Sequence, residues 1–314
     1  MALPDYTASR VASNNDGSDK RELFLKVFSG EVLTAYETMN KMNALHTTRT
    51  ISSGKSAQFP VLGSTTAEYH TPGTMIDGKK ILSTEKVINI DSSLISPVFI
   101  PDIDEAMTHF EYRAEYAKKC AYALALKSDK QVAQLACLAA RASSNLTGGN
   151  GGSTLTLASY DTDGEALAEG LFDAQQVFDE KDIPEDERVF VCRPKHYYLM
   201  ARSTKVLNKD WGGAGVYSDG KVLRVAGIEI IKSNNLPSSN ISSDTGTNNT
   251  YHGDFSNTIG VAFHRSAVGT VRLRDLAMES TGYDPRWQGT LIVAKMLEGH
   301  GILRPEGAIE FKKA

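Results

Sequence analysis

Cysteine is scarce in this chain, and no two of its three cysteines stand close together. Cys120, Cys137 and Cys192 form no CxxC pair, so their spacing excludes a zinc ribbon, a dithiol redox motif and a disulfide framework. We interpret them as reduced, mostly buried thiols of a protein from a cytosolic compartment.

Long apolar runs and a strong charge imbalance are missing as well. No run approaches 18 apolar residues, so we expect no transmembrane helix and no membrane partner. The polar residues 1–19 lack the apolar centre of a secretory signal. The 34 basic and 38 acidic residues give a formal net charge of −4. Proteins that wrap nucleic acid are usually strongly basic, so this charge argues against that class.

Motifs for catalysis and cofactor binding are incomplete. Residues 53–56, Ser-Gly-Lys-Ser, resemble the end of a phosphate loop, but Arg49 stands where its first glycine is required. Asp102 and Asp104 are explained by helix capping, and the seven histidines show neither HxxxH nor HExxH spacing. We therefore predict no catalytic residue, no cofactor and no metal. A cytosolic hydrolase whose catalytic groups meet only in space stays an alternative.

The first segment, residues 1–46, is expected to form an N-terminal arm. A helix is predicted from Asp19, which has Glu22 three residues later, as in a capping box. Phe24 and Phe28 lie on its apolar side, and with Tyr36 they are the residues that we expect to contact another subunit.

The second segment, residues 47–92, is expected to form a long β-hairpin. Residues 48–62 and 81–91 are rich in β-branched side chains, and the sequences 71–73 and 77–80 between them are typical of turns. Arms of about a dozen residues would extend roughly 40 Å. An isolated two-stranded ribbon is only marginally stable in water, so we expect this one to lie across a neighbouring subunit.

Seven residues of the hairpin are predicted to make this contact. They are Phe59, Tyr69, Pro72, Asp77, Lys79, Lys80 and Glu85. Lys79, Lys80 and Lys86 form a small basic cluster near the predicted tip. The cluster is either solvated or paired with an acidic patch on the neighbour, and each exposed pair would contribute only about 0.2–1 kcal/mol.

The third segment, residues 93–150, contains a predicted spine helix that begins at Asp102. Its predicted core residues are Ile103, Met107, Phe110 and Leu124. No proline or glycine interrupts it before Gly148, and a helix to Arg141 would be ~60 Å long. That length requires an elongated body, a break near residues 127–130, or a coiled coil. The charge pattern is poor for a coiled coil, which favours the elongated body.

The remaining residues show both helical and strand patterns, and with the hairpin and the spine helix they make the class α+β. We expect helices at 165–180 and from Pro194, and strands at 188–192, 259–263 and 268–279. Residues 221–232 are predicted as a strand, a turn at Gly227 and a second strand, and residues 291–298 as a strand or a helix. The polar residues 234–257 are expected to be a surface insertion.

Several blocks of the sequence resemble the major capsid proteins of T7-type podoviruses. They are residues 23–35, 51–63, 84–91, 102–107, 263–277 and 299–306, in the order of that family. The resemblance does not extend to residues 1–20, 143–170, 204–220 or 234–257. An encapsulin-like storage shell with the same fold stays an alternative.

The resemblance implies the tailed-phage capsid fold of the Hong Kong 97 type. Residues 1–46 would be its N-terminal arm, 47–92 its extended loop, 93–150 its peripheral domain with the spine helix, 151–265 its axial domain, and 266–314 the return to the peripheral domain. It also implies hexamers and pentamers of an icosahedral T=7 shell, formed around a scaffolding protein and a portal protein. The shell would assemble in the cytoplasm of the bacterial host, expand during maturation and hold double-stranded DNA weakly inside the virion.

Overall fold

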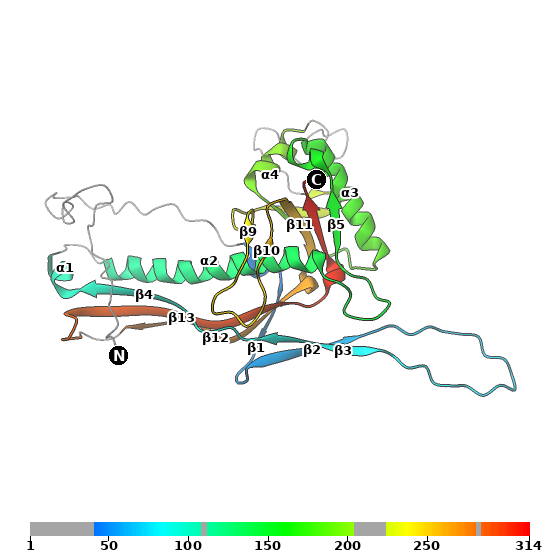
Figure 1. Ribbon diagram of the computed structural model, residues 1–314, viewed down its shortest axis with the longest axis horizontal. Coiled ribbons are helices and arrows are strands. Elements are labelled where there is room, and N and C mark those ends of the chain that lie inside the picture. The colour runs from blue at the N-terminus through cyan, green and yellow to red at the C-terminus, as the bar shows by residue number, and fades with distance from the viewer. Residues whose placement is uncertain (1–40, 108–111, 204–223, 281–283) are drawn as a thin grey trace. The chain divides into compact units, whose positions relative to one another are not determined.

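The computed structural model describes residues 41–107, 112–203, 224–280 and 284–314 (Figure 1). The predicted arm lies outside these residues except for 41–46, so Phe24, Phe28 and Tyr36 are not described, and neither is Phe110. The chain divides into two compact units. Unit 1 contains Ser92–Ser128 and Arg274–Leu297, and unit 2 contains Met39–Asp91, Asp129–Leu273 and Glu298–Ala314.

Unit 2 is built on a six-stranded sheet with the order β5-β14-β11-β6-β8-β7. The strands are β5 (Ser153–Thr156), β6 (Arg188–Cys192), β7 (Arg224–Val225), β8 (Ile228–Lys232), β11 (Thr258–His264) and β14 (Ala308–Lys312). The central strands β6 and β11 are short apolar runs whose residues are buried on both faces, apart from the partly exposed His264. The strands predicted at 188–192 and 259–263 are therefore confirmed.

Two helices pack on one face of this sheet. They are α3 (Gly164–Glu180) and α4 (Pro194–Ala201). The carboxylate of Asp163 accepts a hydrogen bond from the N–H of Glu165 at 2.9 Å, which caps α3, and Pro194 stands in the first turn of α4. Along α3 one stripe of side chains is fully buried, as its helical spacing predicts. The stripe consists of Leu167, Leu171, Ala174 and Phe178.

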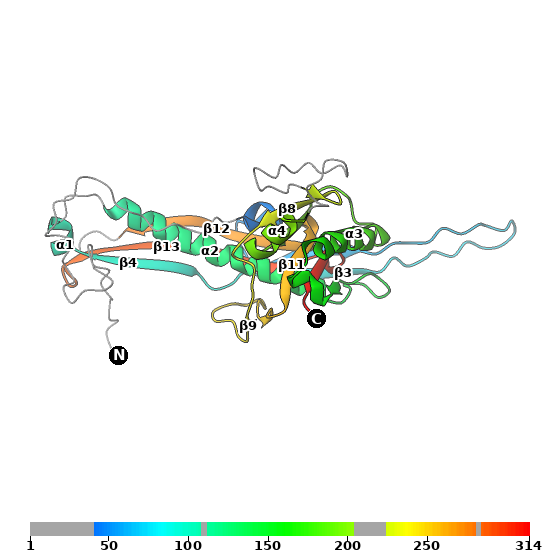
Figure 2. The same ribbon diagram turned by 90° about the horizontal axis from the view of Figure 1, so that it is seen from above.

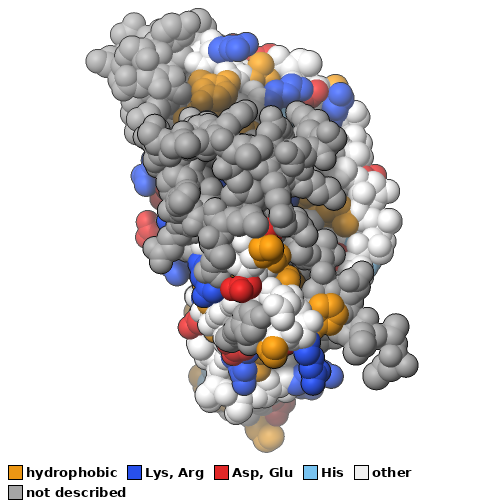
Figure 3. Space-filling view, turned by 90° about the vertical axis from the view of Figure 1, so that its left-hand side faces the viewer, with side chains coloured by type: hydrophobic (Ala, Val, Ile, Leu, Met, Phe, Trp, Pro, Cys, Tyr) orange, Lys and Arg blue, Asp and Glu red, His pale blue; other side chains and the backbone are white. Residues whose placement is uncertain are grey.

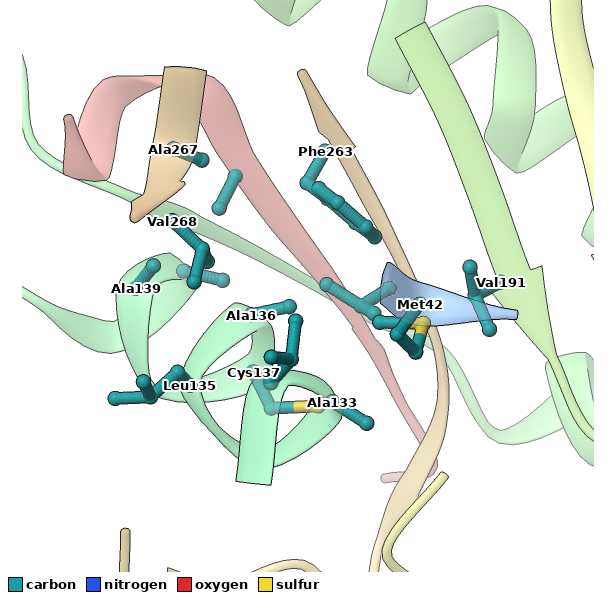
Figure 4. Close-up of a cluster of buried hydrophobic side chains, with 14 of the residues drawn as sticks. Met42, Ala133, Leu135, Ala136, Cys137, Ala139, Val191, Phe263, Ala267 and Val268 are labelled. Carbon is teal, nitrogen blue, oxygen red and sulfur yellow. The ribbon is translucent and has the colours of Figure 1, made fainter. Parts of the chain in front are cut away.

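The other face of the sheet packs against the last turns of α2 (Tyr112–Arg141). Figure 4 shows small side chains of this helix, such as Ala133 and Ala136, in the same buried cluster as Val191 of β6 and Phe263 of β11. Small residues let the helix backbone approach the strands closely, which gives unit 2 a helix–sheet–helix core.

The helix α2 has 30 residues and is ~45 Å long. It passes without a break through residues 127–130, so the predicted alternative of a break there is wrong. The helix ends at Arg141, as predicted. The helix α1 (Asp102–Met107) covers the start of the predicted spine, and residues 108–111, between α1 and α2, lie outside the described part.

Unit 1 contains β4 (Leu94–Pro101), which pairs antiparallel with residues 289–296 of β13 (Gly289–Ile302). Figures 1 and 2 show the first half of α2 running alongside these strands, and Leu124 packs there against Ala294 and Met296. The strand β12 (Val268–Ser280) lies next to β13 in the sheet order β1-β12-β13-β4. The residues 291–298 are therefore a strand, and the helical alternative is wrong.

The insertion at 234–257 is not only a surface feature. It forms the small strands β9 (Asn240–Ile241) and β10 (Gly253–Asp254), and the side chains of Leu236, Tyr251 and Phe255 are buried in the core of unit 2. The prediction of a surface loop was wrong because these apolar residues are too widely spaced to form a helix or strand period. Short 3-10 turns occur at Met42–Ala44, Ala158–Asp161, Arg265–Ala267 and Pro305–Gly307.

Candidate assembly surface

The predicted hairpin is present as a ribbon of two antiparallel strands, β2 (Ser56–Leu62) and β3 (Ser83–Asn89). The register runs from Ser56 opposite Asn89 to Leu62 opposite Ser83. The paired arms are shorter than predicted, because residues 47–50 form a separate strand, β1 (Thr47–Thr50), that pairs in parallel with β12. A bend containing Gly54, whose φ is +115°, separates β1 from the ribbon.

Beyond the ribbon, residues 63–82 form a segment whose side chains are exposed from residue 64 onward. Its predicted turn at Thr71-Pro72-Gly73 is confirmed. The N–H of Thr74 donates to the carbonyl oxygen of Thr71 at 3.2 Å, and Gly73 has a φ of +91°. Proline followed by a glycine with positive φ is typical of a type II turn. The last backbone bond of the ribbon joins the N–H of Gly63 to the carbonyl oxygen of Leu82.

Large apolar side chains gather in this segment without burial. Tyr69, Met75 and Ile76 are 104%, 85% and 75% exposed, and Leu62, Ile81 and Leu82 are also exposed. Exposed apolar side chains concentrated on one segment indicate a surface that contacts another protein. The sequence prediction included Tyr69 and missed the others, although the adjacent pair Met75-Ile76 beside a turn was a signal in the sequence.

The charged residues of the segment are partly paired with one another. The ammonium group of Lys79 lies 2.6 Å from a carboxylate oxygen of Glu68 and 3.2 Å from the hydroxyl of Thr66. Lys80, Asp77 and Glu85 are exposed. Because exposed pairs contribute little, the apolar side chains would supply more energy than the charged ones to a contact made by this segment.

Phe59 lies midway along β2 and is partly buried. The guanidinium of Arg49 lies 5.5 Å from the centre of its ring and donates to the carbonyl oxygen of Gln58 at 3.2 Å. Phe59 is therefore held inside the subunit by a cation–π contact and is separate from the fully exposed apolar group.

The predicted spine residues have different environments. Leu124 is buried in the core of unit 1. Ile103 is 52% exposed, so its prediction as a core residue was wrong. It lies in the first turn of α1, and helical spacing alone does not fix which side of a short helix is buried. Met107 is the last residue of α1.

A buried group at His46, Thr270 and His300 is the arrangement of described residues that most resembles a catalytic constellation. The hydroxyl of Thr270 lies 2.7 Å from a nitrogen of each histidine, and all three residues are only 1% exposed. His46 Nδ1 donates to the carbonyl oxygen of Met42 at 2.8 Å, and burial lowers the pKa of His46 to about 4. His46 Nε2 therefore accepts a hydrogen bond from the hydroxyl of Thr270, and His300 Nδ1–H donates a hydrogen bond to the oxygen of that hydroxyl.

These three hydrogen-bonded side chains are buried away from solvent. Their hydrogen bonds satisfy one another and join β12, β13 and residue 46. In the described part of the chain, no group of three His, Cys, Asp or Glu residues could hold a metal ion. None of the helices described there is long and apolar enough to cross a membrane. Residues 53–55 lie in the bend before β2 and Ser56 begins that strand, so no helix follows them and they do not form a phosphate loop.

Comparison with known proteins gives a consistent likeness. Residues 58–312 match the family described as "Gp10A-like: Major capsid protein". The chain is 35% identical over 345 aligned positions to the major capsid protein of Escherichia phage T7, with 99% of each sequence covered. The capsid structure of the cyanophage P-SCSP1u is similar, with a TM-score of 0.87, 44% identity and 99% of both chains covered.

A more distant structure shows the same fold. The mature capsid of bacteriophage PhiM1 matches with a TM-score of 0.79 at 20% identity, over 98% of this chain and 96% of that one. At this identity the likeness concerns the backbone arrangement alone.

Proposed function

The chain belongs to the Gp10A-like major capsid protein family, and from this membership we propose that its copies form hexamers and pentamers of an icosahedral phage shell. Its role as a structural subunit of a phage shell and the predicted Hong Kong 97-type capsid fold are confirmed. The proposal of hexamers and pentamers goes further, and it is supported by the exposed surface of residues 63–82.

We propose that residues 63–82 lie on a neighbouring copy of the chain. The observation that carries this proposal is the exposure of Tyr69, Met75 and Ile76 on a segment with few contacts of its own. Full burial of one such side chain stabilises by about 1.5–3 kcal/mol, and part of that is offset by the loss of freedom on association. Contacts of this size are weak enough singly to permit correction during assembly and strong when repeated over a shell.

For single residues, we propose a larger role in the contact where the side chain is more exposed. Tyr69 and Pro72 belong to the exposed segment and are proposed as central contacts. Asp77, Lys80 and Glu85 are proposed as polar contacts at its margin. Lys79 pairs with Glu68 inside the segment, and Phe59 stays with Arg49, so both are proposed to shape the surface rather than to dominate its energy.

The N-terminal arm is proposed to make a second contact through Phe24, Phe28 and Tyr36, and to move when the shell matures. The apolar side of its predicted helix supports this. The arm's amides are expected to exchange hydrogen at different rates in precursor and expanded shells. Equal rates would contradict the proposal.

The other proposed partners are a scaffolding protein during assembly, a portal protein at one vertex and packaged double-stranded DNA. The net charge of −4 supports weak, non-specific DNA contact. On the face drawn in Figure 3, the described Lys and Arg side chains lie among Asp and Glu side chains. Tight, salt-sensitive binding of duplex DNA to the unassembled subunit would contradict this part.

We further propose that the shell is non-enzymatic, assembles in the bacterial cytoplasm and becomes part of the virion. The burial of Thr270 and of its two histidine partners supports a non-enzymatic role. An encapsulin-like storage shell is the competing hypothesis. Particles that hold the phage genome support the virion, whereas particles filled with a cargo enzyme would support the storage shell.

The test compares assembly of the wild type with that of a variant carrying Tyr69→Ser, Met75→Ser and Ile76→Ser. Each is expressed with the scaffolding protein and imaged by electron microscopy. The variant should fold, because these side chains are exposed in the subunit, and it should give few closed shells. The control carries Ser64→Ala and Thr65→Ala, which change the same segment but leave its exposed apolar side chains in place. Normal shells from the triple variant would refute the proposed contact.

A further inference from the structure

The ribbon returns to unit 2 at residues 89–91, and side chains from the distant insertion hold this return. The side-chain amide of Asn249 donates to the carbonyl oxygen of Asn89 at 2.6 Å, and its own oxygen accepts from the N–H of Asn89 at 3.3 Å. The N–H of Ile90 instead donates to the carbonyl oxygen of Lys55 at 2.9 Å, on the side of the ribbon that carries β2. Asn249 therefore acts as an extra strand partner on the outer edge of the ribbon.

The carboxylate of Asp91 is the centre of the same arrangement. One of its oxygens accepts from the N–H groups of Asn248 and Asn249 at 2.6 and 3.1 Å and from the side-chain amide of Asn249 at 3.0 Å. The other accepts from the hydroxyl of Tyr251 at 2.5 Å. Hydrogen bonds to a charged acceptor are about twice as strong as neutral ones, so this is a firm attachment point.

Tyr251 connects the attachment point to β13. Its side chain is fully buried, and its hydroxyl oxygen accepts from the N–H of His300 at 3.0 Å. The N–H of Asp91 donates to the carbonyl oxygen of Glu298 at 3.1 Å. The end of β3, the insertion and β13 are therefore joined within unit 2 by a single, partly buried hydrogen-bond network.

Small changes at this root would move the far end of the ribbon a long way. Between Asn89 and the turn at Pro72 the chain can span about 55 Å when extended. A rotation of about 10° at the root would then shift the turn by roughly 10 Å, which is the width of two strands. Such a shift would move residues 63–82 off a contact that fits them in their original position.

We propose that Asp91, Asn249 and Tyr251 form a clamp that sets the direction in which the ribbon leaves unit 2, and thereby the place that residues 63–82 reach on a neighbouring copy. The three are positioning residues, since they touch the root of the ribbon. The inference rests on the proposed contact of residues 63–82 and adds the residues that orient the ribbon toward that contact.

The test uses Asn249→Ala, with Ser243→Ala as a control in an exposed part of the same insertion. The full-length subunit is first unfolded thermally, to show that the variant folds cooperatively. Hydrogen exchange is then measured for residues 83–91. Loss of the Asn249 hydrogen bonds should raise the hydrogen-exchange rate at residues 89–91 about tenfold, whereas Ser243→Ala should leave that rate unchanged. Scaffold-assisted assembly should give misshapen or open shells.

A second variant, Tyr251→Phe, keeps the buried ring and removes only the hydroxyl, so it tests the clamp even if Asn249→Ala does not fold. Closed shells at wild-type yield despite raised exchange would overturn the proposal. Failed assembly with unchanged exchange would overturn it too, because the effect would not pass through the ribbon. If Tyr69→Ser/Met75→Ser/Ile76→Ser fails to assemble while the clamp variants assemble normally, the clamp alone is wrong. Normal assembly of the triple variant refutes the contact itself.

Discussion

Two glycines set how closely β13 approaches the ribbon in unit 2. A Cβ atom on Gly299 would overlap the carbonyl oxygen of Asn89, and one on Gly301 would lie 2.8 Å from a side-chain carbon of Ile88. A glycine inside a strand commonly marks such a close approach of another backbone. The absence of a side chain at these positions therefore permits the buried junction at the ribbon root.

Replacing Gly299 with alanine is expected to destabilise the subunit by about 1–3 kcal/mol, because the new methyl group must displace the backbone at Asn89. Urea unfolding of the unassembled chain measures this. Gly78→Ala is the matched control, since nothing lies within 4 Å of its added carbon, and its change should stay within about 0.5 kcal/mol. Equal stability of the two variants would contradict the close approach.

The buried His46 makes stability depend on pH. Burial lowers its folded pKa to about 4, below the ordinary value of about 6.5 that the unfolded chain retains. As the pH falls, the unfolded chain takes up the proton first. The stabilisation is therefore complete above about pH 6.5 and is lost as the pH falls toward 4.

His46→Gln should reduce this dependence, because glutamine does not titrate. Between pH 7.5 and 5 the wild type should lose about 2 kcal/mol through His46 that the variant does not lose. Urea unfolding at the two pH values measures the difference, with the exposed His70→Gln as control. If His46→Gln and the wild type lose the same amount, His46 is not buried in its neutral form.

Among the elements, those with a local pattern could be predicted from the sequence. The helix α3 and the strand β6 match their predicted bounds within one residue, because helical spacing and short apolar runs are visible in adjacent residues. The strand β1 could not be separated from the hairpin, because its partner β12 is remote in sequence.

In unit 1, Cys120 and Leu124 of α2 pack in a small buried cluster with Ala294 and Met296. Leu124→Ala should destabilise the subunit by about 2–5 kcal/mol, because it leaves a cavity beside Ala294 and Met296. Lys130→Ala, at an exposed position of the same helix, should change little. Thermal unfolding of both variants measures the difference, and a similar small change in both would place Leu124 outside the core.

At the scale of the whole chain, the assembly surface was only partly predictable. The sequence indicated a ribbon that needs a neighbour, and the resemblance to a capsid family identified the kind of neighbour. The sequence did not show that Met75 and Ile76 are the exposed apolar group, nor that Asn249 and Tyr251 reach the ribbon root. Those features depend on contacts between segments far apart in the chain, which no local spacing records.

The most direct test of the account is an electron-microscopy reconstruction of shells assembled from this chain with its scaffolding protein. We expect closed shells in which Tyr69, Met75 and Ile76 are buried against a neighbouring copy of the chain. A closed shell in which these three side chains remain exposed to solvent would contradict the account.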